Sequence, residues 1–405
     1  MSAILVVGAS HAGIHAAASL REGGYAGSIT VVGAEDHLPY HRPPLSKDYL
    51  LGVTERDGFA LRPEAFYASR EIELRRGVRV EKVDATSGTA TTDTGDTLAF
   101  DRLVLATGAR VRRLDVPGGG LDDVVHMRDL DDADRLKALL PGVRRAVVVG
   151  GGFIGLESAA VLARNGVTVT VVEAGDRLLG RAVSPELSAW SADLHRHHGV
   201  EVRTGCAVSA LEGETTVRQA VLTDGGRLDT DLVVVGIGVE PRLELADQLG
   251  LAVDGGIIVD AQARTSAAGI VAAGDATVQP HPLGDGTMVR LESVQNATDQ
   301  AAAAAWSLLG KAPRTQPVVP WFWSDQYDAK LQMAGAPSSH DRAVLRGSPA
   351  DGSFTHLLYR RGVLVGAESV NAPADFVAVR RALATGASPD PDRVSDTSVK
   401  LKTLL

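Results

Sequence analysis

The arrangement of apolar and polar positions in residues 3–35 recurs in residues 146–173. Each stretch contains a short run rich in valine and isoleucine, a glycine turn, an alanine-rich segment and a second apolar run leading to a glutamate. Short continuous apolar runs predict buried parallel strands, and the longer segments between them predict helices. The alanines would let each helix pack closely on its sheet. The repeat therefore predicts two βαβ units of nucleotide-binding type in an α/β fold.

A second and weaker repeat follows each of these units. Residues 103–109 and 233–239 each form an apolar run that ends in small residues. Each run comes after an alternating stretch rich in threonine and valine, at 78–100 and 200–230, which predicts a β-meander. Further short apolar runs between residues 245 and 300 predict a return to the first domain, because the second domain is complete near residue 240.

Pro117 and the glycines at 118–120 are turn-forming residues between the two repeats. Their position predicts the point at which the chain crosses from the first domain to the second.

Composition excludes several classes of protein. The net charge of −9 disfavours a nucleic-acid-binding protein. No apolar run approaches the roughly 20 residues of a membrane span, and no basic segment precedes the first apolar run. We therefore expect a cytoplasmic, multidomain protein that binds neither nucleic acid nor membranes.

Cys206 is the sole cysteine of the 405 residues. A single cysteine excludes an intramolecular disulfide, a dithiol relay and a four-cysteine iron–sulfur or zinc site. We expect Cys206 itself to be a small buried residue.

Gly150, Gly152 and Gly155 follow a predicted strand and open a predicted helix. Glycines at this spacing allow a tight turn and a close approach of a pyrophosphate to the helix N-terminus. The motif predicts a dinucleotide site, and a purely structural turn is the alternative.

Glu173 stands at the end of the next predicted strand, where a carboxylate can accept hydrogen bonds from a ribose 2′-hydroxyl. Its charge would repel a 2′-phosphate, which favours NADH over NADPH. Arg181 and Arg177 lie just beyond and could soften that repulsion.

The first copy of the motif contains Gly8, Ser10 and Gly13, with Glu35 at the end of its second strand. Ser10 replaces the middle glycine but is small enough to leave room for phosphates. Two such sites in one chain predict two dinucleotides, FAD and a nicotinamide, that face each other. The alternative is that one of the two units is an empty relic of the fold.

Three further segments suggest contacts with a flavin. Paired prolines stiffen residues 37–47, and Lys47 is expected at the start of a helix, where a fixed cation can stabilise a reduced flavin. Asp275 follows an apolar strand and could accept hydrogen bonds from a ribityl chain. Residues 292–297 open a predicted helix over 296–309 whose N-terminus could face the pyrimidine edge. The alternatives are a solvated lysine, a turn-forming aspartate and an ordinary capped helix.

The full set of motifs resembles one family. The segments, in chain order, are VGASHAG, EDHLPYHRPPLSK, LATGAR, VVGGGFIGLE, VVEAGDRLLGR, VGIGVEPR, AAGDA, ESVQNA and PWFWSDQYDAKLQMAG. Together they are similar to the FAD-dependent NADH:ferredoxin reductases that supply bacterial monooxygenases and ring-hydroxylating dioxygenases. These reductases belong to the pyridine nucleotide-disulfide oxidoreductase superfamily but lack its redox cysteines. The resemblance covers nearly the whole chain.

The resemblance implies three domains. An FAD-binding domain would comprise residues 1–110 and 243–320, and an NADH-binding domain residues 111–242. Both would be Rossmann-like, as in glutathione reductase. A C-terminal α/β domain would comprise residues 321–405.

The resemblance also implies which residues line the cofactors. FAD would lie against Ala12, Ala34, Lys47, Val80, Arg128, Asp275 and Val294, and NADH along Gly152, Ile154, Glu157, Glu173 and Gly236. The quoted motifs add as cofactor-binding residues Gly8, Ser10, Gly13, Glu35, Arg42, Ala106, Thr107, Gly108, Gly150, Gly155, Arg181, Gly238 and Trp323.

Three of these residues are expected to carry catalysis. Lys47 and Glu157 would sit where the nicotinamide meets the flavin. Trp323, with Trp321 near it, would lie on the side from which electrons leave. Packing at a domain interface is an equally open role for the two tryptophans.

The implied reaction is hydride transfer from NADH to FAD, followed by release of single electrons to an iron–sulfur ferredoxin. An acidic ferredoxin would need a local basic patch on this acidic chain, for which the candidates are Arg62, Arg290, Lys330 and Lys400. We expect a monomer or a weak dimer. Two alternatives stay open from the sequence: an NADH oxidase or quinone-type flavoenzyme, and a non-catalytic flavoprotein that senses NADH.

Overall fold

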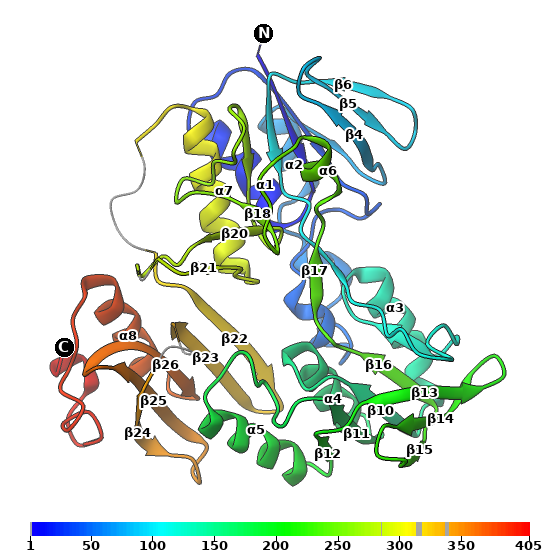
Figure 1. Ribbon diagram of the computed structural model, residues 1–405, viewed down its shortest axis with the longest axis vertical. Coiled ribbons are helices and arrows are strands. Elements are labelled where there is room, and N and C mark those ends of the chain that lie inside the picture. Colours follow the sequence, from blue (N-terminus) through cyan, green and yellow to red (C-terminus); the bar gives the residue numbers. More distant parts are fainter. Residues whose placement is uncertain (1, 285, 313–317, 337–339) are drawn as a thin grey trace. The chain divides into compact units, whose positions relative to one another are not determined.

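The structure is a computed structural model that describes residues 2–284, 286–312, 318–336 and 340–405. The chain divides into two compact units, each built from three segments (Figure 1). The first unit comprises Met1–His41, Arg56–Arg110 and Glu240–Trp321, and the second comprises Arg42–Glu55, Val111–Val239 and Phe322–Leu405.

A five-stranded parallel sheet forms the centre of the first unit, in the order β19-β7-β1-β2-β3. Its strands are β1 (Ala3–Val7), β2 (Ser28–Val32), β3 (Ile72–Arg75), β7 (Arg102–Leu105) and β19 (Ile270–Ala272). Most residues of the inner strands are buried, as a parallel sheet covered on both faces requires.

Helices α1 (His11–Glu22) and α7 (Val294–Leu308) lie side by side in the first unit (Figure 1). Their contact is made largely of alanines, among them Ala16 and Ala17 of α1 and Ala301 of α7, which are all but inaccessible to solvent. Such small side chains let the two helices approach each other and the sheet closely.

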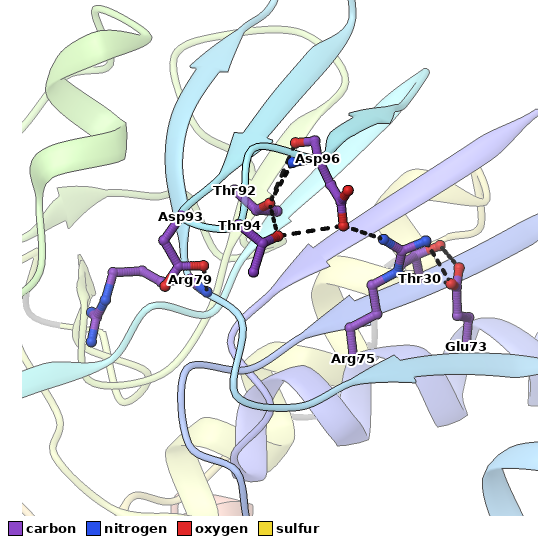
Figure 2. A network of polar contacts seen from close by, with 8 residues as sticks. All are labelled: Thr30, Glu73, Arg75, Arg79, Thr92, Asp93, Thr94 and Asp96. Carbon is purple, nitrogen blue, oxygen red and sulfur yellow. Dashed lines mark hydrogen bonds and ion pairs between the residues drawn. The ribbon is translucent and has the colours of Figure 1, made fainter.

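A three-stranded antiparallel sheet of β4 (Val80–Asp84), β5 (Thr89–Thr92) and β6 (Thr97–Ala99) lies between β3 and β7 in the chain. Figure 2 shows the polar contacts that tie this sheet to edge strand β3. Arg75 of β3 forms ion pairs with Glu73, at 2.8 Å, and with Asp96 in the turn between β5 and β6, at 3.6 Å. The exposed edge of the parallel sheet is thereby covered with charge.

Shorter elements complete the first unit. They are η2 (Arg56–Phe59), α2 (Glu64–Ser69), α6 (Glu244–Gln248), β18 (Ile257–Ile258), β20 (Thr277–Pro280) and β21 (Met288–Val289).

The second unit contains a parallel sheet in the order β12-β11-β10-β16-β9. Its strands are β9 (Val124–His126), β10 (Arg145–Val149), β11 (Thr168–Glu173), β12 (Glu201–Thr204) and β16 (Leu232–Val235). The helical elements are η1 (Pro43–Ser46), α3 (Leu130–Leu139), η3 (Leu140–Gly142), α4 (Phe153–Arg164) and α5 (Pro185–His197). An antiparallel sheet of β13 (Val208–Gly213), β14 (Val217–Leu222) and β15 (Arg227–Asp229) precedes β16.

The two parallel sheets confirm the repeat predicted from the sequence. In each, the first strand of the βαβ unit is central and the strand after the meander pairs on its other side. The fifth strand differs in origin, since β19 follows its unit in the chain whereas β9 precedes its unit. The predicted meander at 200–230 begins too early, because β12 (Glu201–Thr204) belongs to the parallel sheet.

The predicted crossing at Pro117 to Gly120 is wrong. On either side of the second βαβ unit, the chain passes between the units at Arg110 and at Glu240, in segments that carry the short strands β8 (Ala109–Val111) and β17 (Val239–Pro241). The turn at Pro117 instead packs on β13, where the Leu211 amide donates to the Pro117 carbonyl at 2.8 Å. Gly118 has φ +80°, and a β-carbon there would lie 1.9 Å from the Leu211 carbonyl oxygen.

The C-terminal part of the second unit is a five-stranded sheet in the order β22-β23-β26-β25-β24, packed on α8 (Figure 1). Its elements are β22 (Trp321–Gln326), β23 (Ala329–Gly335), β24 (Arg342–Ser348), β25 (Ser353–Arg360), β26 (Val363–Val370), α8 (Pro373–Thr385) and η5 (Leu401–Thr403). Within the residues described, no helix combines the length and the apolar character that a membrane crossing demands.

Arg346 of β24 fixes the end of the chain to this sheet. Its buried guanidinium forms an ion pair with Asp375 at 2.9 Å and donates to the carbonyls of Val394, Asp396 and Val399 at 2.7–2.9 Å. One side chain thus satisfies carbonyls of a segment that has little regular structure of its own.

Candidate functional site

The glycine turn of the first unit brings three backbone segments into close contact. Gly8 has φ +112°, and a β-carbon there would lie 2.0 Å from the Ala106 carbonyl oxygen. A β-carbon on Gly13, in the first turn of α1, would lie 1.7 Å from the Gly8 carbonyl oxygen. Larger residues at either position would force the backbone apart. Strand β1, helix α1 and the end of β7 therefore converge on one turn at the carboxyl edge of the sheet.

The second unit contains a turn of the same construction. Gly150 has φ +105°, and its β-carbon would lie 2.4 Å from the Gly236 carbonyl oxygen, at the end of β16. A β-carbon on Gly155 would lie 2.1 Å from the Gly150 carbonyl oxygen. Each turn leads directly into a 12-residue helix, and a helix N-terminus behind a glycine turn is the arrangement that binds a pyrophosphate.

The middle position of the motif is less restricted. The nearest neighbour of a β-carbon on Gly152 would be the Gly236 carbonyl oxygen, 3.9 Å away, and both Gly152 and Ser10 are the N-cap residues of their helices. This open space explains why Ser10 fits where the second copy has glycine.

A glutamate lies at or just beyond the end of the second strand of each βαβ unit, since Glu173 is the last residue of β11 and Glu35 comes three residues after β2. Both carboxylate oxygens of Glu173 accept backbone hydrogen bonds, from the amides of Gly151 and Gly175, each at 2.7 Å. Glu35 accepts a hydrogen bond from the Tyr40 hydroxyl. The two amide donors hold the Glu173 carboxylate beside its glycine turn, where a ribose attached to a bound pyrophosphate would extend.

The loop of Asp275 lies next to the N-terminal half of α1. Asp275 is half-buried and follows Gly274, whose β-carbon would lie 3.1 Å from that of Ala12. The side chain of Gln300 in α7 accepts hydrogen bonds from the Gly274 amide, at 2.8 Å, and from the Thr277 hydroxyl, at 2.9 Å. Gln300 thereby fixes this loop against α7.

Two more buried amides extend this contact. Gln300 donates to Gln279 at 2.8 Å, and Gln279 donates to Asn296 at 2.7 Å. All three side chains are buried. The sequence analysis missed this network, although ESVQNA was recognised as a motif, because its partners lie on β20 and in the interior of α7.

The other first-unit candidates differ in exposure. Ala106 and Val80 are buried, and Val80 packs in the core against Val7 and Val32. Ala34 is exposed. The remaining two lie in the turn after β7, where the Thr107 hydroxyl donates to the Arg242 carbonyl at 3.0 Å and the Gly108 carbonyl accepts from the Arg242 amide at 3.0 Å.

Val294 is the first residue of α7. This helix begins two residues before the predicted start at residue 296, because the hydroxyl of Ser293 accepts a hydrogen bond from the Asn296 amide and caps the helix there.

Lys47 follows a short helix instead of starting one, so that prediction is wrong. Pro43 and Pro44 open the 3₁₀ helix η1, which their restricted φ angles favour, and the Lys47 amide closes it by donating to the Pro44 carbonyl at 3.1 Å. The Lys47 side chain leaves the helix at its C-terminal end, where a cation also interacts favourably with the backbone dipoles.

Lys47 lies between two carboxylates and an indole ring, all within the second unit. Its Nζ is 3.1 Å from Glu157 Oε1 and 3.3 Å from Asp325 Oδ2. The same atom is 5.8 Å from the ring centroid of Trp323, within the range of a cation–π contact. The structure therefore brings the three expected catalytic residues, Lys47, Glu157 and Trp323, into one cluster.

Glu157 is 3% exposed and is the centre of this cluster. It accepts hydrogen bonds from the hydroxyl of Ser46 at 2.5 Å and from that of Ser324 at 2.6 Å. Burial raises the pKa of the Glu157 carboxyl, and Lys47 and the two hydroxyl donors oppose that effect. Ser46, Ser324 and Asp325 are functional candidates that the sequence analysis did not select, although they adjoin Lys47 and Trp323 in the chain.

The other candidates of the second unit are on helix α4, near the glycine turn, and in or beside the first segment of the unit. Ile154, in the first turn of α4, is 41% exposed although apolar. Arg181 approaches Gly238, whose β-carbon would be 3.4 Å from the guanidinium. Arg42 donates to the carbonyl of Arg128 at 2.9 Å.

The predicted site residues divide between the two units. The first unit carries Gly8, Ser10, Ala12, Gly13, Ala34, Glu35, Val80, Ala106, Thr107, Gly108, Asp275 and Val294. The second carries Arg42, Lys47, Arg128, Gly150, Gly152, Ile154, Gly155, Glu157, Glu173, Arg181, Gly236, Gly238 and Trp323.

The basic-patch candidates also divide between the units. Lys330 and Lys400 are exposed in the second unit. In the first unit, Arg290 forms an ion pair with Glu292 at 2.9 Å, and Arg62 stacks on the ring of Phe66 at 5.4 Å.

Comparison with known proteins assigns the family. Residues 2–301 match the pyridine nucleotide-disulphide oxidoreductase model, and residues 321–405 match the reductase C-terminal model. The chain therefore belongs to the pyridine nucleotide-disulphide oxidoreductases, and it is similar to the ferredoxin reductases that carry this C-terminal domain. The family resemblance and the α/β fold class expected from the sequence are confirmed.

Individual relatives agree with this assignment. Rhodocoxin reductase of Rhodococcus erythropolis is 42% identical over 98% of this chain and 93% of its own length, and putidaredoxin reductase of Pseudomonas putida is 38% identical over 99% and 96%. The crystal structure of the ferredoxin reductase for the CYP199A2 system of Rhodopseudomonas palustris matches with a TM-score of 0.96 and 42% identity, covering 100% of this chain and 99% of that chain. The covalent complex of putidaredoxin reductase with putidaredoxin also matches with a TM-score of 0.96, at 37% identity, covering 100% and 98%.

Proposed function

We propose that this chain is an FAD-dependent ferredoxin reductase that takes hydride from NADH. It passes the electrons singly to an iron–sulfur ferredoxin that serves a monooxygenase or dioxygenase. The observation that carries the proposal is the combination of two glycine turns of the same construction with one buried Lys47–Glu157 ion pair. The similarity to ferredoxin reductases over the whole chain supports the same function.

The first-unit turn fits the pyrophosphate of FAD. Gly8 and Gly13 bring the backbone of β1, α1 and the end of β7 together at the start of α1, and Glu35 accepts a hydrogen bond from Tyr40. Asp275 and the N-terminus of α7 supply an acceptor and a positive dipole at the same edge of the sheet. FAD, when bound, accepts one hydride, which carries two electrons, and can give these electrons up one at a time.

The second-unit turn fits the pyrophosphate of NADH. Gly150, Gly152 and Gly155 supply the same cradle at the start of α4, and Glu173 supplies ribose acceptors. Because two backbone amides fix the Glu173 carboxylate in place, its charge cannot easily move away from a 2′-phosphate. This arrangement supports NADH as the preferred donor.

Lys47, Glu157 and Trp323 would orient and stabilise the reacting groups. Glu157 and Asp325 anchor the Lys47 ammonium, so that its charge occupies one position. A fixed ammonium favours negative charge that develops near it, without acid–base chemistry by the protein. Trp323 contributes a large flat apolar surface beside this charge.

The partner is proposed to be an acidic ferredoxin that docks through weak, salt-sensitive contacts. The exposed Lys330 and Lys400 are the basic residues of the second unit that we propose for this surface. A monomeric or weakly dimeric state and a cytoplasmic location stay predictions.

The absorption spectrum of the purified full-length protein tests the cofactor half of this proposal. We expect flavin bands that bleach when NADH is added without oxygen, and that bleach more slowly with NADPH. A colourless protein that takes up no added FAD would contradict the proposal, as would a flavin that neither nicotinamide reduces.

A further inference from the structure

A chain of buried polar side chains leads away from Glu157 within the second unit. Ser324 of β22 contacts Glu157 at 2.6 Å, Gln326 of the same strand donates to Ser324 at 3.1 Å, and His195 of α5 contacts Gln326 Oε1 at 3.0 Å. Tyr327 contacts the other ring nitrogen of His195 at 3.2 Å. Ser324, Gln326 and His195 are 0% exposed. Polar groups are not buried in such a row without partners, and here each one has its partner in the row.

The hydrogen-bond donors in this row of side chains all point toward Glu157. The amide oxygen of Gln326 can only accept, so His195 Nε2 carries the hydrogen, and Nδ1 then accepts from the Tyr327 hydroxyl. Burial lowers the pKa of His195 to about 4, which keeps the ring neutral, and its contact with the Gln326 oxygen selects the Nε2–H tautomer. Gln326 donates to Ser324, and Ser324 donates to the carboxylate. Aligned donors polarise one another and strengthen the last bond in the row.

Protonation of Glu157 would conflict with this arrangement. A carboxyl protonated at Oε1, the oxygen that Ser324 contacts, would donate to Ser324, whose hydroxyl would have to turn toward Gln326. The Gln326 amide would then have to flip, and His195 would have to change its tautomer. Gln326 also prevents proton transport along the row, because an amide does not readily take up and release a proton. The row therefore orients dipoles and does not conduct protons.

We propose that Gln326 and His195 are positioning residues that act through Ser324 to keep the buried Glu157 carboxylate ionised. By doing so they keep the Lys47 ammonium anchored at the candidate hydride-transfer site. The inference rests on the proposed function, since it concerns the cluster to which that function assigns Lys47 and Glu157.

The ionisable groups around Glu157 come from several elements. Lys47, after η1, is the charge in direct contact with it, and Asp325 of β22 contacts Lys47 in turn. His198 of α5 stacks on Tyr327 with ring centroids 3.6 Å apart, at the outer end of the row. Because burial already raises the pKa of Glu157, each donor lost moves the group nearer to protonation at working pH.

The test is a pH titration of the oxidised, flavin-loaded protein in which the infrared band of the protonated Glu157 carboxyl is followed. Glu157→Gln identifies the band by removing it. In Gln326→Leu we expect the carboxyl to bind its proton about tenfold more tightly, a shift of about one pH unit. Tyr327→Phe, which removes the outermost donor, should give a smaller shift in the same direction.

Ser191→Ala is the matched control. Ser191 is also buried on α5, but its hydroxyl donates to the Leu187 carbonyl outside the row. Its removal should leave the titration unchanged. The rate constant for flavin reduction by NADH should fall on the acid side at a pH that moves in step with the infrared titration.

An unmoved titration in a folded Gln326→Leu protein overturns the inference, and so does an equal shift in Ser191→Ala. If Gln326→Leu does not fold, the same criterion is applied to Tyr327→Phe, because that substitution removes only the hydroxyl and keeps the packing of the ring. The infrared titration needs neither nicotinamide nor ferredoxin. If the Glu157 titration shifts as expected in Gln326→Leu but no electrons reach ferredoxin, the proposed function alone is overturned.

Discussion

At the scale of single residues, absent side chains determine the geometry of the two glycine turns. Gly8 with Gly13, and Gly150 with Gly155, bring backbone segments so close that a β-carbon would lie 1.7–2.4 Å from a carbonyl oxygen. These positions could be predicted from the sequence, because the motif reflects local backbone geometry. The Ser10 departure is equally local, since a β-carbon at the matching Gly152 of the second unit would have no neighbour closer than 3.9 Å.

Substitution of the last glycine in each motif should affect one cofactor site and leave the other intact. Gly13→Ala places a β-carbon 1.7 Å from the Gly8 carbonyl oxygen, and we expect it to abolish FAD retention. Gly155→Ala disturbs the other turn, and we expect it to keep the flavin but weaken NADH binding at least about tenfold, or 1.4 kcal/mol. Flavin content and NADH titration measure these effects, and Ser10→Gly should behave as wild type. Loss of flavin from Gly155→Ala alone would reverse the assignment.

Glu173 should decide the choice of nicotinamide. Glu173→Arg replaces a fixed carboxylate with a cation, so NADH should bind about tenfold more weakly while NADPH gains. Dissociation constants for both nucleotides check this expectation. Glu214→Arg makes the same charge change at an exposed site of the second unit and should leave the preference unaltered. Unchanged NADH affinity in Glu173→Arg would show that the carboxylate does not hold the ribose.

At the scale of elements, sequence patterns predicted the strands and helices, which have a periodic apolar pattern, and missed the contacts between elements that lie far apart in the chain. Buried parallel strands, alanine-rich helices and meanders leave a recognisable pattern, and they are present. The contacts of Glu157 come from η1 and β22, far from α4 in the chain, and such pairings leave no periodic trace. Lys47 was misplaced for a similar reason, since paired prolines favour a 3₁₀ turn as well as a helix start.

Helix α5 should give the protein a characteristic loss of stability in acid. His195 has a pKa lowered from 6.5 to about 4 by burial, so the unfolded chain binds this proton more tightly than the folded protein. Above pH 6.5 the ring is neutral in both the folded and the unfolded state, and the folded protein has its full stability. As the pH falls from 6.5 toward 4, the free energy of unfolding should decrease by about 3 kcal/mol in all.

Thermal unfolding midpoints between pH 7 and pH 4 test this expectation. The midpoint should fall less steeply with pH in His195→Gln than in wild type, and His197→Gln, at an exposed site on the same helix, should follow wild type. Identical pH slopes in all three proteins would contradict the role of His195.

The C-terminal segment should depend on one arginine. Arg346→Met leaves Asp375 without its ion pair and three carbonyls without their donor, which should cost about 3 kcal/mol and expose the tail to proteases. Arg342→Met removes an exposed ion pair with Asp392 and should cost less than about 1 kcal/mol. Limited proteolysis distinguishes the two variants, and equal digestion would contradict the proposed anchoring.

At the scale of the whole molecule, the repeat explains how one chain holds two nucleotide sites. The second βαβ unit lies in the chain between β7 and β19 of the first unit, which is why β19 follows so much later than the rest of its sheet. The crossing points could not be predicted from Pro117, because a turn packed within a unit and a turn between units have the same local sequence.

With Cys206 buried in the core and no second cysteine in the chain, a dithiol relay is excluded. The electrons are therefore expected to leave directly from the flavin.

The most direct test of the account is NADH-dependent reduction of cytochrome c by the purified enzyme, with and without an iron–sulfur ferredoxin. The account predicts a rate that is negligible without ferredoxin, rises to saturation as ferredoxin is added, and weakens as salt is raised. A full rate in the absence of ferredoxin would contradict it and would indicate an enzyme that passes its electrons to small molecules.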